Sequence, residues 1–454
     1  MALIELDLTA RPDQALSSPP PARQYRLAGL LLAALLLGAL GGAAPIVPQL
    51  WREVGTVPVV ADPQMPFEVV DGRLYTFDPV GETETTATAW TLDNEPRRMW
   101  TVPITTGEAG PDGLRVASGG TRVDHLGDVV LLSSGPESVV VDARTGAVRW
   151  SSPSRVVPLA GGRIGVVESE RFRPGTVYDQ NAGLPGPLYF SSTGVPHTEP
   201  PTRTDVRGVD LSTGRTVWTA PSSGSVNVVP APGDAPAVLI LSSTGIERRD
   251  GTTGEVVRQV PLERAGRPGP ILGELVGGTM LVYYGFESGF VAAYAPDTLA
   301  PLWSRVLPVP VIDPPDCDDV LCSGSRSALD VLDPATGRPL FRAPKADLVR
   351  RPGYLLEVGP TSGLPIRLVD PVTGRGRVDL TGWQAEVPDS ADRLILLRRV
   401  EEGQQSTVFG VVHPGRDEVQ PLGRTDRAFF DCVADPRHVV CREDDALRIW
   451  AYRA

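Results

Sequence analysis

The chain has 454 residues, with 48 Gly, 46 Pro, 55 acidic and 43 basic side chains, a net charge of −12 and a pI near 5.0. Surfaces that bind nucleic acid are basic, so this charge balance argues against a phosphate-binding surface. Lysine occurs only at Lys345, and the use of arginine for nearly all cations is typical of a high-GC bacterial genome.

The N-terminal segment predicts a membrane anchor. Residues 1–26 are polar and rich in Pro and Ser, as expected of a disordered tail. An uncharged run of 21 residues begins at Leu27 and ends at Val47, and it is long enough to cross a hydrocarbon core of about 30 Å as a helix. Arginines precede the run, so the positive-inside rule places the N-terminus in the cytoplasm and the rest outside. A cleaved signal peptide is the alternative, but Pro45 would directly follow the cut, so we favour an uncleaved anchor.

A short pattern recurs along the rest of the chain: an apolar strand, Asp, two variable residues, Thr, Gly and a second strand. The Asp side chain can accept backbone hydrogen bonds from residues just ahead of it, and Gly supplies a positive φ. The steps between successive glycines are 68, 40, 83 and 37 residues. A step of 83 covers two units with a degenerate copy between them, and a step of 68 is one unit plus an insertion. The glycines of the pattern are Gly146, Gly214, Gly254, Gly337 and Gly374.

Repeats of about forty residues with several short strands indicate the blades of a β-propeller. We therefore predict an all-β fold over residues 66–454, a β-propeller of four-stranded antiparallel blades, with eight blades expected and seven as the alternative. The last unit shows only three strands. A strand such as residues 56–61, within a stalk at 48–65, is expected to complete it and close the ring.

One unit is interrupted at residues 169–203 by a loop-like segment between its second and third strands. Long loops in compact domains often carry function, so this insertion is a candidate binding loop. A flexible insertion, or a lid packed on its own propeller, is the alternative. The candidate contact residues are Tyr178, Asp179, Tyr189, Phe190 and His197.

The four cysteines form two local pairs, Cys317 with Cys322 and Cys432 with Cys441. Members of each pair belong to neighbouring strand-like runs, so we predict two disulfides and hence an oxidising compartment. Two pairs of free thiols are the alternative. A zinc site is disfavoured because the four histidines do not cluster around the cysteines.

The full pattern resembles the repeat of the PQQ-binding-like β-propeller superfamily, most closely at Asp142, Thr145, Gly146, Trp150 and at Asp210, Thr213, Gly214, Trp218. This superfamily includes quinoprotein dehydrogenases, which hold PQQ and a calcium ion near the ring axis, and scaffolds without enzymatic activity. The enzymes carry an adjacent Cys-Cys pair, which this chain lacks. The resemblance therefore implies no cofactor here, and it implies that Trp150 and Trp218 serve blade packing.

Sequence motifs of hydrolases and nucleotide-binding proteins are absent: there is no G-x-S-x-G, P-loop or G-x-G-x-x-G after a strand. The arginine pairs Arg350-Arg351 and Arg398-Arg399 could bind an anionic partner, but in a chain of net charge −12 they are expected to form surface ion pairs. The leading hypothesis is an extracytoplasmic, membrane-anchored propeller that binds an envelope protein or glycan without catalysis. The alternatives are a PQQ-dependent oxidoreductase and a glycan- or peptidoglycan-binding propeller.

Overall fold

The computed structural model describes Leu30, Leu32 and residues 51–452, apart from 60–64, 81–83, 106–120, 180, 182, 184–185, 263–268, 286–288, 308–316, 318–319, 326–327, 345–346, 352, 360, 388–394, 402–405 and 430. The chain forms two units, Met1–Gln49 and Leu50–Ala454. The predicted tail and the predicted anchor lie outside the described residues, except Leu30 and Leu32, which are helical and exposed. Across the described part of the chain, no helix is both long and apolar enough to span a membrane.

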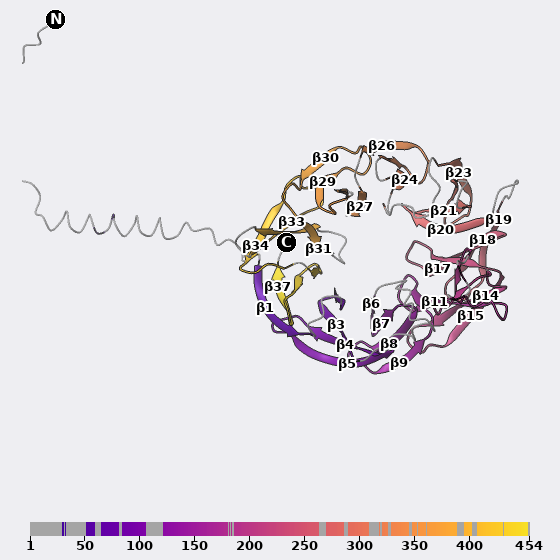
Figure 1. Ribbon diagram of the computed structural model, residues 1–454, viewed down its shortest axis with the longest axis horizontal. Helices are drawn as coiled ribbons and strands as arrows, with labels where there is room; N and C mark the ends of the chain where they lie inside the picture. The colour runs from indigo at the N-terminus through magenta and orange to yellow at the C-terminus, as the bar shows by residue number, and fades with distance from the viewer. Residues whose placement is uncertain are drawn as a thin grey trace, which may run out of the picture. The chain divides into compact units, whose positions relative to one another are not determined.

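The second unit is a β-propeller whose sheets follow one another around a ring, each with its first strand toward the axis and its last at the rim (Figure 1). Blade 1 contains β2 (Phe67–Val70), β3 (Arg73–Pro79), β4 (Glu84–Thr91) and β5 (Arg97–Thr105). Blade 2 contains β6 (Arg122–Leu126), β7 (Val129–Ser134), β8 (Glu137–Asp142) and β9 (Val148–Ser152). Blade 3 contains β10 (Val156–Pro158), β11 (Ile164–Arg171), β14 (Arg203–Asp210) and β15 (Thr216–Ser223). A separate hairpin, β12 (Tyr189–Phe190) and β13 (Pro196–His197), lies within blade 3's insertion.

The remaining blades continue in chain order. Blade 4 contains β16 (Val226–Pro230), β17 (Ala237–Ser242), β18 (Gly245–Asp250) and β19 (Val256–Pro261), and blade 5 contains β20 (Pro270–Val276), β21 (Thr279–Tyr284), β22 (Phe290–Tyr294) and β23 (Pro301–Val306). The described strands of blade 6 are β24 (Leu321–Ser325), β25 (Ala328–Leu332) and β26 (Pro339–Pro344). Blade 7 contains β27 (Asp347–Arg351), β28 (Tyr354–Val358), β29 (Pro365–Val369) and β30 (Gly376–Asp379). Blade 8 contains β31 (Ala385–Val387), β32 (Ile395–Glu401), β33 (Ser406–Val412) and β34 (Gln420–Thr425).

Blade 9 closes the ring with strands from both ends of the unit. Its order is β35 (Cys432–Ala434), β36 (His438–Arg442), β37 (Ala446–Tyr452) and then β1 (Trp51–Pro58). β1 runs antiparallel to β37, with Trp51 opposite Tyr452 and Pro58 opposite Ala446. An N-terminal strand thus fills the fourth place, and it begins five residues before the expected 56–61 because Trp51 itself pairs with the last strand.

The described residues form nine blades, so the expectation of eight, or of seven, is wrong. Two weakly marked units account for the difference. The axis strand of blade 8 has only three residues, and blade 9 is a complete sheet only when β1 is added. Neither unit carries the Asp-x-x-Thr-Gly pattern from which the repeats were counted.

The hydrophobic core confirms this blade count. Nine clusters of buried side chains occur in the described chain, and each contains residues of two consecutive blades. One of them joins blade 9 to blade 1 through Val57, Phe67, Leu74 and Ile449. The sheets therefore bury both faces against neighbours, and the ring is sealed at every seam.

The Asp-x-x-Thr-Gly segments form tight turns between the third and fourth strands, as the sequence predicts. Asp142 Oδ1 accepts hydrogen bonds from the backbone N–H of Arg144 at 3.1 Å and of Thr145 at 2.9 Å, and from the Thr145 hydroxyl. Gly146 has a φ of 71°. The hydrogen bond from Arg149 contributes most to holding the pKa of the Asp142 carboxyl well below its ordinary value, and those from Thr145 add to it.

Each of these turns also receives a large side chain from the rim strand of the preceding blade. Trp150 of blade 2 donates its indole N–H to the carbonyl of Leu211 in blade 3's turn at 2.8 Å, and the ring covers Gly214. Trp150 and Trp218 both pack in this way, and we call this contact the latch. The same latch joins Trp100 to Gly146, Trp218 to Gly254, Trp303 to Gly337 and Phe341 to Gly374.

Candidate functional site

The two faces of the ring differ in what they carry. Since successive strands of a blade are antiparallel, connections between first and second strands and between third and fourth strands share one face, which we call the turn face. Connections between second and third strands lie on the opposite face, as do the connections from one blade to the next. We call this face the insertion face. The Thr-Gly turns and the start of β1 at Trp51 lie on the turn face, whereas the insertion at 172–202 lies on the insertion face.

The insertion continues the ladder between β11 and β14 and then forms a small structure of its own. Thr202 donates its backbone N–H to the carbonyl of Arg171 at 2.8 Å, which closes the base. Above it, the β12–β13 hairpin pairs Tyr189 with His197. Ser192, in the turn of that hairpin, donates its backbone N–H to the Glu170 carboxylate at 2.8 Å. The insertion is thus tied to its own blade.

His197 forms the interior of the insertion. Its side chain is 8% exposed and its ring stacks on Phe172, with 3.6 Å between centroids. The Thr176 hydroxyl donates to the carbonyl of Arg173 and therefore accepts from Nδ1 of His197 at 3.1 Å, so Nδ1 carries a proton. Burial lowers the pKa of His197. His197, predicted as a contact residue, therefore packs the insertion internally.

The other predicted contact residues have different environments. Tyr178 is partly buried and donates its hydroxyl to the carbonyl of Gly183 at 3.2 Å. Asp179 is exposed and accepts the backbone N–H of Asn181 at 2.9 Å, which fixes a local turn. Tyr189 is partly buried. Phe190 is the one of the five whose apolar side chain reaches solvent, at 48% exposure.

Sequence reasoning missed two further apolar side chains of the insertion. Val177 is 52% exposed and Val195 is 36% exposed, and they flank the hairpin that carries Phe190. A lone valine in an irregular segment gives no periodic signal of which side faces outward, so only the fold of the insertion identifies them. Val177 pairs with His197 and Phe190 pairs with Pro196, so Val177 and Phe190 lie on opposite faces of this small sheet. We call the three exposed side chains, Val177, Phe190 and Val195, the apolar tip.

Two carboxyl groups near the ring interior have strongly shifted pKa values. Burial raises the pKa of Glu68 to about 7, although the carboxylate accepts the backbone N–H of Val123 in the next blade at 2.9 Å. Burial raises the pKa of Glu168 to about 8, and the nearby Glu170 charge adds to this shift. Burial is the largest cause of both shifts.

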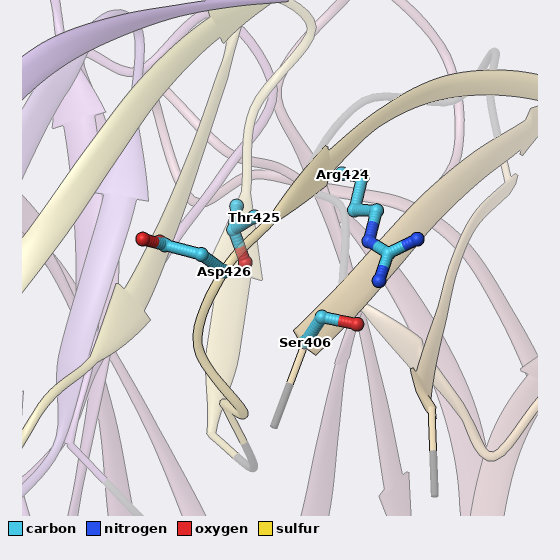
Figure 2. A pocket seen from close by; sticks show the side chains of 4 residues that line it. All are labelled: Ser406, Arg424, Thr425 and Asp426. Atoms are coloured by element: carbon cyan, nitrogen blue, oxygen red, sulfur yellow. The ribbon is translucent and has the colours of Figure 1, made fainter. Parts of the chain in front are cut away.

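Two cavities open on the insertion face. The larger, of about 710 Å³, lies between blades 7 and 8 and includes Leu364, Ile366, Trp383 and Arg399 in its lining. The smaller, of about 490 Å³, is bounded by Ser406, Arg424, Thr425 and Asp426 (Figure 2). In Figure 2 the Asp426 carboxylate extends away from the Arg424 guanidinium, so these two charges do not form a converging site.

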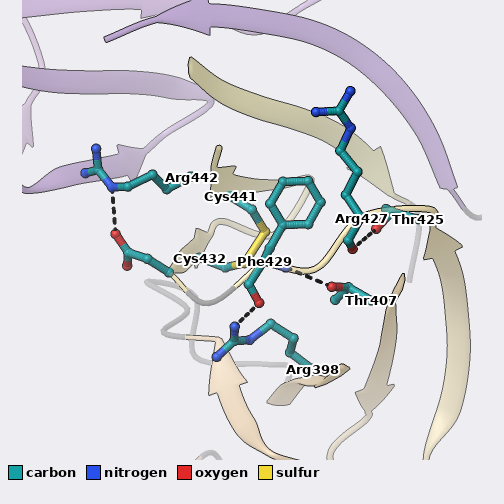
Figure 3. The surroundings of a disulfide bond; sticks show 9 residues. Arg398, Thr407, Thr425, Arg427, Phe429, Cys432, Cys441 and Arg442 are labelled. Atoms are coloured by element: carbon teal, nitrogen blue, oxygen red, sulfur yellow. Dashed lines mark hydrogen bonds and ion pairs between the residues drawn. A yellow bond between two sulfur atoms is a disulfide. The ribbon is translucent and has the colours of Figure 1, made fainter. Parts of the chain in front are cut away.

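Both predicted disulfides are confirmed, Cys317–Cys322 and Cys432–Cys441, and the described residues include no free cysteine. The second crosses from the axis strand of blade 9 to its neighbour (Figure 3). Nearby, Arg398 donates to the carbonyl of Phe429. Arg398 is buried, so its predicted place in a surface ion pair is wrong, and burial lowers its pKa.

Two histidines have ring nitrogens engaged within the fold. The Asp71 carboxylate lies 3.0 Å from Nδ1 of His125, while the Arg73 guanidinium lies 3.1 Å from its Nε2. A guanidinium only donates, so Nε2 is the acceptor and Nδ1–H donates to Asp71. His438 similarly contacts Asp435 through Nδ1 at 3.2 Å. In this arrangement His125 has no ring nitrogen left to act as a general base.

The residues described do not fit PQQ with calcium. Calcium requires several converging oxygen ligands, and no three His, Cys, Asp or Glu side chains converge on a metal position in the described regions. The cysteines of each disulfide are 5 and 9 positions apart, so no adjacent pair exists. Trp150 and Trp218 are held in latches at the rim. We therefore derive no chemistry through this cofactor.

Neither a protein-family model nor a curated protein matches the chain. Among solved structures, BamB from Moraxella catarrhalis is similar at 14% identity, covering 88% of this chain and 98% of that one, with a TM-score of 0.40. Sqt1 from Saccharomyces cerevisiae is similar at 11% identity, covering 89% and 97%, with a TM-score of 0.42. The quinohemoprotein alcohol dehydrogenase ADHIIG from Pseudomonas putida HK5 is similar at 12% identity, covering 88% and 76%, with a TM-score of 0.41. Likenesses at this level carry no argument about activity.

Proposed function

We propose that this chain is a non-catalytic binding module of the cell envelope. Residues 27–47 anchor it in the cell membrane, with the N-terminus in the cytoplasm and the propeller outside. The insertion on blade 3 contacts an envelope protein through its apolar tip. The two disulfides support this location because such bonds persist in oxidising compartments.

The apolar tip is the observation that carries the proposal. The insertion has its own interior, the Phe172–His197 stack, and yet Val177, Phe190 and Val195 are exposed around one short hairpin. Exposed apolar side chains on a well-ordered element are candidate interaction sites, and aromatic residues supply much of the energy at protein interfaces. The hairpin therefore keeps the Phe190 side chain exposed, where a partner can bind it.

The chain enters the propeller at Trp51, on the turn face, whereas the insertion projects from the opposite face. The apolar tip and the start of β1 therefore lie on opposite faces of the propeller.

The test is chemical cross-linking and pull-down of the full chain from envelope membranes. We expect Phe190→Ser to lose the specific protein partner. Val372→Ser is the matched control, because Val372 is an apolar side chain of 59% exposure on a Thr-Gly turn. If Phe190→Ser and the wild type recover the same proteins, the insertion is not the contact surface. Recovery of glycan in place of protein would favour the glycan-binding alternative.

The oxidoreductase alternative is tested by titrating the full chain with PQQ in the presence of Ca²⁺ and following absorbance and melting temperature. The proposal expects no saturable binding and no rise in melting temperature. Saturable binding together with PQQ-dependent dye reduction would replace the binding-module proposal by the enzyme.

A further inference from the structure

The larger cavity lies apart from the insertion, between blades 7 and 8. One wall comes from the connection between β28 and β29, the floor from the connection between β30 and β31, and the far wall from the end of β32. All three segments open on the insertion face. Its volume of about 710 Å³ falls within the range of roughly 300–1,000 Å³ that is usual for small-molecule sites.

The lining combines an apolar wall with one charge. Leu364 and Ile366 are 44% and 40% exposed, and they border the cavity together with Pro365 and the indole of Trp383. Among the ten described residues that line it, Arg399 is the only charged one. A cavity of this kind favours a ligand with an apolar body and a negative charge, and it does so within a chain whose net charge is −12.

The polar end of the cavity is held in place by its own contacts. The Arg399 guanidinium lies over the Trp383 ring, 5.5 Å from its centroid. Trp383 donates its backbone N–H to the carbonyl of Leu380 at 3.0 Å, and its ring edge lies against Gly410, where an added Cβ would be 2.6 Å away. Stacking fixes the plane of a guanidinium, which has five N–H donors and can therefore bind an anion while keeping other partners.

Backbone contacts hold the rest of the floor. Gln384 accepts the backbone N–H of Val400 at 2.8 Å through its side-chain oxygen and donates its own backbone N–H to the carbonyl of Arg398 at 3.0 Å. These two bonds join blade 7's exit segment to β32 across the base of the cavity. The cavity is thus formed before any ligand arrives, which reduces the ordering cost of binding.

We propose that this cavity binds a small amphipathic anion, with the apolar body against Leu364, Ile366 and Trp383 and a carboxylate or phosphate on Arg399. The site is independent of the apolar tip, which belongs to blade 3. It adds a small-molecule ligand to a module whose protein contact lies elsewhere on the same face.

The test uses three probes with one apolar body and different charge: 6-phenylhexanoate, 6-phenylhexanol and 6-phenylhexylamine. Binding to the full chain in nanodiscs is measured by calorimetry, with empty nanodiscs as the blank. We expect one saturable site for the anion, with at least about ten-fold weaker binding of the alcohol, as expected from loss of a charge-assisted hydrogen bond. Binding of the amine should be weaker still.

Variants locate the site. Arg399→Gln should abolish the preference for the anion over the alcohol, while Arg399→Lys should retain part of it. Ile366→Ser should weaken all three probes. Arg424→Gln, in the neighbouring smaller cavity, is the matched control and should bind as the wild type does. Deletion of residues 172–202 should leave the anion affinity unchanged, which separates this site from the apolar tip.

Three results would overturn the proposal: no saturable binding of the anion, equal affinity for anion and alcohol in the wild type, or an anion affinity that Arg399→Gln and Ile366→Ser leave unchanged in folded protein. Folding of each variant is checked by its melting temperature. If Arg424→Gln weakens anion binding and Arg399→Gln does not, the anion binds in the smaller cavity. That result would contradict the assignment.

Discussion

Trp150 and Gly214 are in contact across the seam between blades 2 and 3. The indole ring lies so close that a Cβ added to Gly214 would be 2.7 Å from Trp150 Cγ, and the indole N–H donates to the carbonyl of Leu211 at 2.8 Å. The repeat pattern therefore encodes two halves of one contact, the Gly of one turn and the Trp that comes from the blade before it.

Gly214→Ala should destabilise the propeller by more than a positive φ alone explains. Gly135→Ala is the matched control, because Gly135 has a φ of 58° and an added Cβ there meets nothing within 4 Å. We expect a loss of about 1 kcal/mol at Gly135 and about 2–4 kcal/mol at Gly214, where the methyl group also displaces the indole. Chemical denaturation measures both losses of unfolding free energy. Equal losses would show that the Trp150 contact adds nothing to the cost of a side chain at Gly214.

The seam between blades 4 and 5 lacks both residues of the latch, so a latch can be introduced there by substitution. Arg258 stands where blades 1, 2, 3, 5 and 6 have Trp or Phe, and the following turn has Leu299, with a φ of 56°, in place of Gly. Arg258→Trp and Leu299→Gly should each destabilise, the first by overlap and the second because Leu299 is fully buried. The double variant should recover at least about 1 kcal/mol relative to the sum of the single changes. Additive losses in denaturation experiments would argue against a pairwise latch.

Stability should depend on pH through Glu168. Burial raises its pKa from 4.5 to about 8 in the folded state. Between those pH values the unfolded chain releases the proton and the folded chain keeps it, so this group's contribution, fully present below the lower value, is lost as pH rises. We expect Glu168→Gln to remove that decline, which has a slope of at most about 1.4 kcal/mol per pH unit. Unfolding free energies at pH 5 and pH 8 measure it, with exposed Glu255→Gln as control; equal pH dependence in wild type and Glu168→Gln would refute the assignment.

The two disulfides should contribute comparable stability. Replacing Cys432 and Cys441 by Ala should cost about 2.5 kcal/mol, and replacing Cys317 and Cys322 about 2 kcal/mol, because the first pair closes the longer loop. Denaturation with and without reductant measures these losses. Alkylation of rapidly quenched cells tests the location at the same time: protected cysteines are expected, whereas fully alkylated cysteines would contradict an extracytoplasmic propeller.

Local chemistry explains which features were predictable from the sequence. The Asp142 turn, both cysteine pairs and the interruption between second and third strands involve residues near each other in the chain, so spacing alone revealed them. Blade number was not predictable in the same way, because blade 8's axis strand is short and blade 9 joins residues from both ends of the unit. His197 was misplaced because only the hairpin's packing on Phe172 decides which way the imidazole faces.

The cavity between blades 7 and 8 was hidden for a different reason. Its walls come from three segments that only the ring brings together. Arg398 and Arg399 also point to opposite sides of β32, since side chains alternate along a strand. One is buried against Phe429, and the other lies over Trp383. A pair of adjacent arginines therefore has two separate environments.

Because β1 pairs with β37, the ring can close only after both of these strands have been synthesised. Trp51 belongs to β1, the first described strand of the propeller, and its partner Tyr452 belongs to β37, the last. Until β37 has been synthesised, β1 lacks its partner strand and blades 9 and 1 have no seam between them. Termination of translation before Ala446 would remove β37 and leave the seam between blades 9 and 1 open, and such products are expected to be cleared by proteases.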